Sequence, residues 1–483
     1  MNRKVVLLAF ILWLLSAVMS LFAVGLLELQ IAYASPYTNI DVYTAYDMIT
    51  NGSYPDLVVL DVRTKGEYDS GHIYGAVWIP VTELDARIGE LAGHEKHEII
   101  VYCLSGGRSA TASGKLDSHS FTKVYNMLGG ITAWQSAGYP VWIATVHNIN
   151  TTFNYDTIQA AIDAPQTLDR HTVLVDAGIY YEHIVVNKSI SLIGENRNNT
   201  IIDGNNIGTV IIITADTITI SGFAIRNYEY YPESGIRLES NYNIVNDNII
   251  TDDLGYFGVY LDGANHNYIY GNTIVGMLYA VWGNFSDNNV LERNNVSLSS
   301  YSGIQFEYSK NNTIIDNYSK YSIAGVCLRN CSGNNIVSGN TMLWSVLHGL
   351  MLEDTNHTTI VHNNFVNNTN DVYLNRSFDN TWDNGCEGNY WSNYNGTDLD
   401  GDGIGDEYLP WEEVDYYPLM SPYIDGDVNH DTIVDIVDLS IVSIALWSTP
   451  IDPKWNPHAD LNGDDLIDIV DLTIVAIHLW ETW

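Results

Sequence analysis

The sequence predicts a multidomain protein with three successive folds: an α/β domain, a parallel β-helix (a solenoid) and a small α-helical domain with two EF-hand-like calcium loops. Three observations lead to this prediction. Short apolar runs alternate with helix-like segments near the N-terminus, and glycine and asparagine markers in the middle recur every 22 to 24 residues, apart from one glycine gap of 45 residues that equals two periods. An aspartate-rich motif occurs twice at the C-terminus. A chain of 483 residues also exceeds the size of one ordinary core.

Composition and charge narrow the possible partners. With 46% hydrophobic and 16% charged residues, the chain has the composition of a globular protein rather than a disordered one. The formal net charge of -38 repels phosphate backbones, so nucleic acid is excluded as an expected partner. Acidic residues concentrate in the last hundred positions, which favours hard cations, calcium first, as their counter-charge.

The N-terminus predicts export. Residues 1–34 carry the basic residues Arg3 and Lys4 near their start. A run of 23 uncharged residues follows, and the segment ends in a small-x-small site suited to signal peptidase. The apolar run is also long enough to span a bilayer, so a retained anchor is the alternative to cleavage. In both cases the rest of the chain is expected outside the cell or on its surface, and a membrane would be contacted only through an uncleaved N-terminal segment.

Residues 36–142 are expected to form the α/β domain, with Cys103 in a turn between a strand and a helix. Helix N-termini and backbone N–H groups stabilise a thiolate, so Cys103 is a candidate nucleophile. Arg108 can hold an anionic sulfur donor. The rest of the candidate substrate-binding loop is Leu104, Ser105, Gly106, Gly107 and Ser109.

This segment resembles a single-domain rhodanese, whose active loop reads Cys-x-x-Gly-x-Arg. Further signatures of that family are present at Asp61-Val62-Arg63, Glu67-Tyr68, Gly71-His72-Ile73, Gly129-Gly130-Ile131 and Trp134. The resemblance implies a covalent persulfide on Cys103, formed from a small donor such as thiosulfate and discharged to cyanide or a thiol, without an organic cofactor. Asp61 and His72 are interpreted as structural. A domain used only for contacts, with an inert buried cysteine, is the alternative.

Three tests of the sulfurtransferase hypothesis concern the thiol itself. An ordinary alkaline pKa, a side chain sealed from solvent, or a bridge to another half-cystine would each argue against it. The sequence has four cysteines. Cys327 and Cys331 are close enough in sequence to pair, whereas Cys103 and Cys386 stand apart.

Residues 146–422 carry two repeat markers with the same period. A period of 22 to 24 residues, with Ile and Val at alternate positions, predicts one β-helix coil per repeat, stacked about 4.8 Å apart. Asparagines at equivalent turns are then expected to form hydrogen-bonded ladders.

The helix-like start at Thr157 is expected to cap the first coil. The glycine markers are Gly235, Gly258, Gly303, Gly325 and Gly349. The asparagine markers are Asn248, Asn272, Asn294, Asn317, Asn340 and Asn363.

This segment resembles the NosD-like and pectate-lyase-like right-handed parallel β-helices. Two outward-facing stacks are expected on one face of the coils. The first is Arg237, Tyr260, Trp282, Gln305, Cys327, Met351 and Tyr373. The second is Glu239, Asp262, Asn284, Glu307, Arg329 and Glu353. The candidate carbohydrate residues among them are Tyr260, Trp282, Tyr373, Glu239 and Asp262.

A solvated acidic face is the simpler interpretation of these stacks, and polysaccharide binding is favoured over cleavage because polygalacturonase-type signatures are absent. Kinship with NosD also suggests copper, but the sequence contains no clustered His or Met ligand set.

Three acidic loops predict calcium binding. The loop 398–406 places Asp398, Asp400, Asp402 and Asp406 around a glycine turn. Residues 423–483 repeat one motif 33 residues apart, with ligands at EF-hand positions and Asp in place of Glu at position 12. The first set is Asp427, Asn429, Asp431, Ile433 (through its carbonyl), Asp435 and Asp438. The second set is Asp460, Asn462, Asp464, Leu466 (through its carbonyl), Asp468 and Asp471.

The C-terminal segment resembles a type I dockerin, which implies a cohesin-like partner. His430 and Thr432 depart from the usual Gly-Asp-Gly and are expected to weaken the first loop. The apolar pairs at 436–437 and 469–470 predict a hydrophobic partner face. Three functions therefore remain: an exported sulfurtransferase docked to a surface assembly, a non-catalytic polysaccharide-binding scaffold, and, by fold analogy only, a cellulosome-like enzyme of polysaccharide catabolism.

Overall fold

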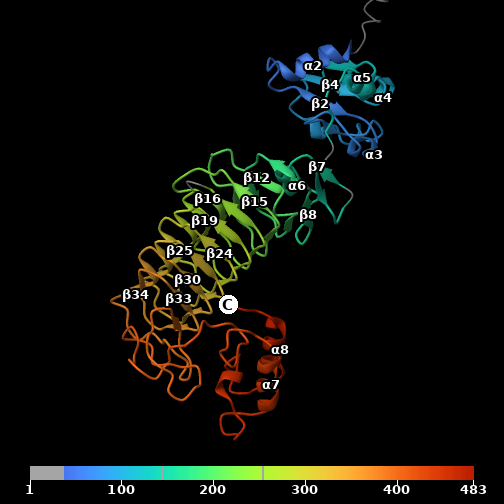
Figure 1. Cartoon of the computed structure of the whole chain (residues 1–483). Helices are drawn as coiled ribbons and strands as arrows, with labels where there is room; N and C mark the ends of the chain where they lie inside the picture. The colour runs from blue at the N-terminus through green and yellow to red at the C-terminus, as the bar shows by residue number, and fades with distance from the viewer. Residues whose placement is uncertain (1–36, 143–144, 152, 253–254) are drawn as a thin grey trace, which may run out of the picture. The chain divides into compact units, whose positions relative to one another are not determined.

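The computed structural model describes residues 37–142, 145–151, 153–252 and 255–483. The chain divides into two compact units, Met1–Ala144 and Thr145–Trp483 (Figure 1). The predicted export segment, residues 1–34, lies outside the described residues. Within the described ranges, no helix is both long enough and apolar enough to cross a membrane.

The first unit contains a five-stranded parallel sheet in the order β1-β5-β4-β2-β3. Alternate residues of the central strands enter two separate cores, with Leu60 and Val101 in one and Val59 and Ile100 in the other, so both faces of the sheet are covered. The strands are β1 (Thr38–Ile40), β2 (Val58–Asp61), β3 (Val77–Trp78), β4 (Glu98–Tyr102) and β5 (Lys123–Met127). The helices are α2 (Val42–Thr50), α3 (Lys65–Asp69), η1 (Ile88–Leu91), α4 (Gly107–Ser118) and α5 (Gly130–Ser136).

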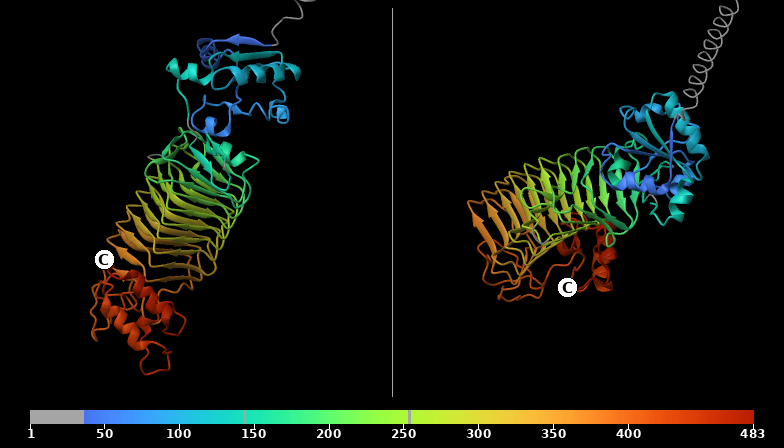
Figure 2. Two further views of the ribbon diagram at one scale, coloured as in Figure 1. Left: turned by 90° about the vertical axis from the view of Figure 1, so that its right-hand side faces the viewer. Right: turned by 90° about the horizontal axis from the view of Figure 1, so that it is seen from above.

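The second unit contains a parallel β-helix of about 13 turns, built from three long sheets. The coils are visible edge-on in Figure 2. The nine-stranded sheet is β10 (Ile184–Val186), β13 (Ile211–Ile213), β16 (Ser234–Leu238), β19 (Phe257–Asp262), β22 (Tyr279–Asn284), β25 (Ser302–Glu307), β28 (Ala324–Arg329), β31 (His348–Glu353) and β34 (Asn370–Asn375).

The other two sheets complete each coil. The eleven-stranded sheet is β32 (Thr358–Val361), β29 (Asn335–Ser338), β26 (Thr313–Ile315), β23 (Val290–Glu292), β20 (Tyr268–Tyr270), β17 (Ile244–Asn246), β14 (Thr219–Ser221), β11 (Ser191–Gly194), β8 (Thr172–Val175), β6 (Val146–Asn148) and β7 (Asn154–Tyr155). The ten-stranded sheet is β35 (Tyr390–Trp391), β33 (Asn364–Val366), β30 (Thr341–Leu343), β27 (Tyr318–Lys320), β24 (Asn295–Ser297), β21 (Thr273–Val275), β18 (Ile249–Thr251), β15 (Ala224–Arg226), β12 (Thr200–Asp203) and β9 (Gly178–Tyr180).

The marker glycines mark close approach between coils. A Cβ atom on Gly258 would lie 2.5 Å from the carbonyl oxygen of Ala280 in the next coil. A Cβ on Gly325 would lie 2.6 Å from the carbonyl oxygen of Gly349. Side chains at these positions would therefore push adjacent coils apart, which explains why the sequence repeats glycine there.

The predicted asparagine ladder is present and fully buried. In each step the backbone N–H and the side-chain amide of one asparagine donate to the Oδ1 of the next, as from Asn272 to Asn294 at 3.1 and 3.0 Å. The ladder runs from Asn248 to Asn389. A second ladder, not predicted from the sequence, comprises Asn243, Asn267, Asn289, Asn312 and Asn335, each of which donates its backbone N–H to the Oδ1 of the next.

A short helix caps the first coil as expected. The helix α6 (Ile158–Asp163) begins at Thr157, whose hydroxyl accepts from the N–H of Ala160 at 3.2 Å. Its apolar face, Ile158, Ala161 and Ile162, is buried in the core of the β-helix. The cap thus shields apolar residues that the first coil would otherwise expose.

The C-terminal segment contains two repeats of loop and helix, with α7 (Ile436–Ala445) and α8 (Ile469–His478) joined through the 3₁₀ helix η2 (Pro457–Ala459). Asp435 and Asp468 cap these helices, and each forms a capping box with the aspartate three residues later. Val442 and Val475 contribute to one small apolar core.

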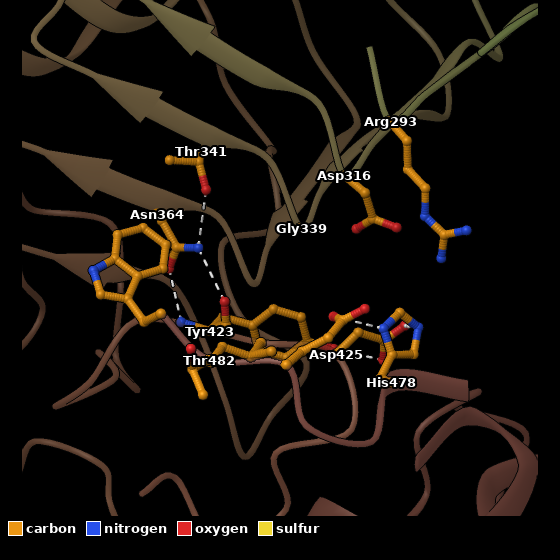
Figure 3. A pocket seen from close by; sticks show the side chains of 12 residues that line it. Arg293, Asp316, Gly339, Thr341, Asn364, Tyr423, Asp425, His478 and Thr482 are labelled. Atoms are coloured by element: carbon orange, nitrogen blue, oxygen red, sulfur yellow. Dashed lines mark hydrogen bonds and ion pairs between the residues drawn. The ribbon is translucent and has the colours of Figure 1, made fainter. Parts of the chain in front are cut away.

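This segment packs on the β-helix. Asn364 in β33 accepts from the backbone N–H of Tyr423 at 2.7 Å and donates to its carbonyl at 3.0 Å (Figure 3). Beside this contact lies a cavity of about 400 Å³ lined by both parts, including Arg293, Asp316 and His478 (Figure 3).

Candidate functional sites

Cys103 lies where the sequence predicts it, directly after β4 and before α4. Gly106 caps α4 at a φ of +105°, a conformation that favours glycine, and its N–H points at the Cys103 Sγ from 3.1 Å. From the other side Gly130 packs on the same loop, because a Cβ there would lie 2.3 Å from the Cys103 carbonyl oxygen. The N–H of Ile131 donates to that carbonyl at 2.9 Å.

The loop favours the anionic form of the thiol. Burial by itself would raise the pKa of Cys103, but hydrogen bonds from Ser109 and from the N–H groups of Gly106 and Ser105 lower it below the usual value. Ser109 is held in place by Asn126, whose Oδ1 accepts its hydroxyl at 2.6 Å. Cys103 is also a free cysteine.

One expectation about the thiol is not met. Cys103 is only 1% exposed, whereas a sulfur open to solvent was expected. The thiol belongs to the apolar core on one face of the sheet, and the next residue, Leu104, is 46% exposed instead.

Arg108 has a partner that the sequence did not indicate. Its guanidinium forms a two-pronged ion pair with Glu67 of α3, at 2.7 and 2.6 Å. Hydrogen bonds from Arg108, followed by those from Thr64, hold the pKa of Glu67 far below its usual value. The side chains are separated by 41 residues in sequence, so only the family signature Glu67-Tyr68 could have drawn attention to the acid.

Asp61 and His72 make the contacts of structural residues. The fully buried Asp61 holds the guanidinium of Arg63 at 2.6 Å. His72 stacks on the ring of Tyr68 with centroids 3.8 Å apart, and its Nδ1 lies 3.0 Å from the Tyr68 carbonyl.

The two predicted stacks on the nine-stranded sheet have the expected register. Tyr260 pairs with both Arg237 and Trp282 along the stack, and the Tyr260 and Trp282 rings are stacked at 5.1 Å. Further along, however, Gln305 is 1% exposed and Cys327 is fully buried, so these positions do not face solvent as expected. The aromatic surface is therefore interrupted before Tyr373.

An arginine lies between the paired carboxylates of this face and forms an ion pair with each. Arg237 lies 3.0 Å from Glu239 and 2.5 Å from Asp262. A general acid and base with separated pKa values would need different surroundings, so this arrangement does not favour a glycosidase mechanism.

The suggested pairing of Cys327 with Cys331 does not occur, because both thiols are free. Cys331 instead points into the coil, where its Sγ lies 3.3 Å from the Phe306 carbonyl oxygen. Burial raises the pKa of each thiol to about 12.

The two C-terminal loops have the same internal hydrogen bonds. Asp427 accepts from the N–H groups of Asp431 and Thr432, and Asp460 accepts from those of Asp464 and Asp465. Asp438 and Asp471, at position 12, are fully buried. Their carboxylates accept from N–H groups at positions 2 and 3 and at the helix cap.

These loops fit calcium. Burial first, and repulsion from Asp438 in addition, raises the pKa of Asp427 to about 6. The ligand positions predicted on both loops hold oxygen donors only, which suits a hard cation. The isoleucines and valines at 436–437 and 469–470 are 46 to 60% exposed, so the apolar face expected next to the loops is present.

The loop 398–406 is a second type of acidic site. Oxygens of Asp398, Asp400 and Asp406 lie within 4.8 Å of one another. Asp402 is not part of this group, and its Oδ1 accepts from the N–H of Ile404 instead.

The structure also assembles a group that sequence reasoning missed. Ligand atoms of Glu387, His430 and His458 lie within 4.8 Å of one another. The sequence shows no cluster of His or Met ligands, and the fold brings these residues together from separate segments. The three residues are far apart in sequence, and only the unusual histidine at position 4 of the first calcium loop gave a signal.

Comparison with known proteins supports the three-part architecture. The family model described as periplasmic copper-binding protein (NosD) matches residues 120–396. The models of the rhodanese-like domain and of the dockerin type I domain match residues 41–137 and 425–479, respectively.

Individual relatives match the first unit. The chain is 41% identical over 78 residues to the protein YrkF of Bacillus subtilis, which covers 16% of this chain and 41% of that protein. It is 33% identical over 113 residues to thiosulfate sulfurtransferase 16, chloroplastic, of Arabidopsis thaliana, covering 21% of this chain and 91% of the relative. A crystal structure of a rhodanese-related protein from Thermoplasma volcanium is 32% identical, with coverage of 22% of this chain and 99% of that one and a TM-score of 0.20.

Proposed function

The chain belongs to the NosD family of β-helix proteins, and from this premise we propose that it is a surface-associated β-helix protein whose rhodanese-like domain transfers sulfane sulfur through Cys103. The observation that carries the proposal is the lowered pKa of a free thiol enclosed by N–H groups at the start of α4. The known sulfurtransferase among the relatives supports the same chemistry.

The proposed reaction has two nucleophilic steps. The Cys103 thiolate attacks the outer sulfur of thiosulfate, the sulfur–sulfur bond of the donor breaks, and sulfite leaves with the electron pair. Cyanide or a thiolate then attacks the terminal sulfur of the persulfide, and the Cys103 thiolate is the leaving group. The amides around Sγ stabilise the negative charge at the start and at the end of the cycle.

Because the thiol of Cys103 is buried, the sulfur donor must first gain access to it. Leu104 and Ser105 are exposed, whereas Gly130 of α5 packs on the backbone of Cys103. We therefore assign donor entry to a movement of residues 104–107. The Glu67–Arg108 ion pair would fix the far end of this segment.

The direct test is sulfur transfer from thiosulfate to cyanide by the full-length chain, measured as thiocyanate, together with mass spectrometry of the chain after incubation with thiosulfate alone. We expect turnover and one added sulfur atom on the peptide containing Cys103. Absence of both would leave the non-catalytic scaffold as the function.

The ion pair at the loop gives a second measurable effect. We expect Glu67→Gln to lower kcat/KM for thiosulfate by about 10-fold or more, because Arg108 loses the partner that fixes its position. Glu83→Gln is the matched control, since Glu83 forms an exposed ion pair with Arg87 in the same unit. Equal kcat/KM values for the two variants would show that Glu67 does not position Arg108 for the reaction.

A second candidate function, polysaccharide binding by the β-helix, is favoured by the stacked rings of Tyr260 and Trp282 on the nine-stranded sheet. Both rings are partly exposed. This function needs no catalytic acid, so it is compatible with the arginine between Glu239 and Asp262. Loss of retention on immobilised polysaccharides in a Trp282→Ala variant would support it.

The C-terminal segment is proposed to bind calcium through its two loops and a cohesin-like protein through the exposed apolar pairs at 436–437 and 469–470. Calcium supplies the positive charge that balances the clustered aspartates and fixes the loops. The loop 398–406 is a third proposed calcium site, with Asp398, Asp400 and Asp406 as ligands and Asp402 outside the group.

Calcium removal has an expected consequence. Chelation should make the C-terminal segment sensitive to protease while the β-helix persists, because the aspartates then repel one another. We expect Asp438→Asn to bind one calcium fewer per chain in a calorimetric titration. Asp452→Asn, which alters an exposed turn, should leave the stoichiometry unchanged. Equal stoichiometry in both variants would contradict the ligand assignment.

A further inference from the structure

Glu387 has a buried carboxylate surrounded by three imidazole rings. Its Oε2 lies 2.8 Å from Nε2 of His362, and its Oε1 lies 3.3 Å from Nε2 of His430 and in direct contact with Nδ1 of His458. The side chains of Glu387 and His430 are 8% and 7% exposed. Such a concentration of imidazole and carboxylate groups is typical of metal sites.

The four residues come from different parts of the second unit. His362 follows β32, and Glu387 precedes β35, at the end of the β-helix. His430 belongs to the first calcium loop, and His458 lies in η2 between the two repeats. The group therefore lies where the C-terminal segment contacts the last coils.

The surroundings fix the position of His430. Its φ is +56°, and its ring packs on Gly403, where a Cβ atom would come within 2.8 Å of the ring. The rings of His430 and His458 are perpendicular, with centroids 5.2 Å apart. His362 stacks on Tyr423 at 4.2 Å. The imidazoles are therefore held by packing rather than by the carboxylate alone.

Two ring nitrogens of this group contact the Glu387 carboxylate without good hydrogen-bond alignment. The Nε2 atoms of His362 and His430 are buried and have no well-aligned hydrogen-bond partner. A metal ion between the Glu387 carboxylate and the facing ring nitrogens would give this buried polar group well-aligned partners.

We propose that Glu387, His430 and His458 bind a divalent transition metal of the zinc type, one ligand atom from each. These atoms lie within 4.8 Å of one another. Small rotations of the side chains bring them to the metal distances of about 2.0 to 2.2 Å that zinc prefers. His362 holds the second carboxylate oxygen and orients the ligand without being one.

This site differs from the acidic loops in the chemistry of its ligands. Two imidazoles and one carboxylate favour a borderline-soft cation, whereas the loops present oxygens alone. Bound metal would attach the first calcium loop and η2 to the end of the β-helix. Metal binding would explain why His430 replaces the residue usual at this position of a dockerin loop.

The experiment is a calorimetric titration of the calcium-saturated, full-length chain with Zn²⁺ in excess calcium. We expect one Zn²⁺ per chain. Glu387→Gln and His458→Gln should each weaken binding by more than about 10-fold, and His362→Gln by about 10-fold. The control His357→Gln changes an exposed histidine of the same unit and should leave the affinity unchanged.

X-ray absorption spectroscopy of the zinc-loaded native chain provides a measurement that does not depend on how the variants fold. Scattering from two imidazole rings is expected. An oxygen-only shell, Zn²⁺ that calcium displaces, or equal affinity in native chain and properly folded variants would overturn the proposal. In that case protons on the histidines supply the counter-charge of Glu387.

Discussion

Replacing Cys103 with serine is expected to lower the rate of thiosulfate-to-cyanide sulfur transfer by at least about 1,000-fold, because no persulfide can form on a hydroxyl. The side chain is nearly the same size, and the loop hydrogen bond from Gly106 can be kept, so the fold should be unchanged. Thiocyanate formation by the full-length native chain and by the variant gives the comparison directly.

The matched control is Cys386→Ser, which should retain native activity. The two free thiols have pKa values shifted in opposite directions, since burial, followed by repulsion from Glu387, raises the pKa of Cys386 to about 11, whereas the pKa of Cys103 is lowered. Transfer that survives in the Cys103 variant would exclude this thiol as the nucleophile.

The difference in pKa between Cys103 and Cys386 also predicts how alkylation of the two thiols depends on pH. A lowered pKa means that the reactive thiolate of Cys103 is present at lower pH than that of an ordinary thiol and is lost only as the pH falls further. Small alkylating reagents should therefore modify Cys103 before Cys386 at neutral pH. Alkylation that rises only at alkaline pH would contradict the assignment.

The second large effect is expected in the buried asparagine ladder. Asn294→Ala should destabilise the β-helix by about 3 to 5 kcal/mol, because several buried groups lose their partners at once. Its Oδ1 accepts from Asn272, and its amide donates to Ile269 at 2.8 Å and to Asn317 at 3.0 Å. Urea unfolding followed by far-UV circular dichroism measures the change.

The adjacent residue provides the control. Asn295 lies in β24 with its side chain exposed, so Asn295→Ala should change the free energy of unfolding by less than about 0.5 kcal/mol. Equal stability of the two variants would show that the ladder does not contribute to the free energy of unfolding as proposed.

Periodic features of this fold were predictable from the sequence. A β-helix brings equivalent residues together coil after coil, so the period alone placed Asn272 beside Asn294 and Tyr260 beside Trp282. The second asparagine ladder has the same period, and Asn243 and Asn267 could have been found by the same count. Local motifs were equally informative, because the loop after β4 and the capping aspartates depend on neighbours in sequence.

Contacts between distant segments could not be predicted in this way. Glu67 reaches Arg108 across the first unit, and His458 reaches Glu387 because the C-terminal segment folds back on the β-helix. Burial was also missed where it depends on outer side chains: Gln305 and Cys327 occupy outward positions of the register but are covered. Neither kind of information is encoded in spacing or residue type.

The glycine contacts and paired asparagine ladders have a consequence for how the β-helix can change length. Each coil presents the same donors below and the same acceptors above, as Asn272 and Asn294 do, so whole coils can be inserted or deleted without leaving a polar group unpaired. Partial insertions, in contrast, must go into the bends between strands. The separation between the two ends of the solenoid is thus adjustable in increments of about 4.8 Å, which makes the middle of the chain a spacer of variable height.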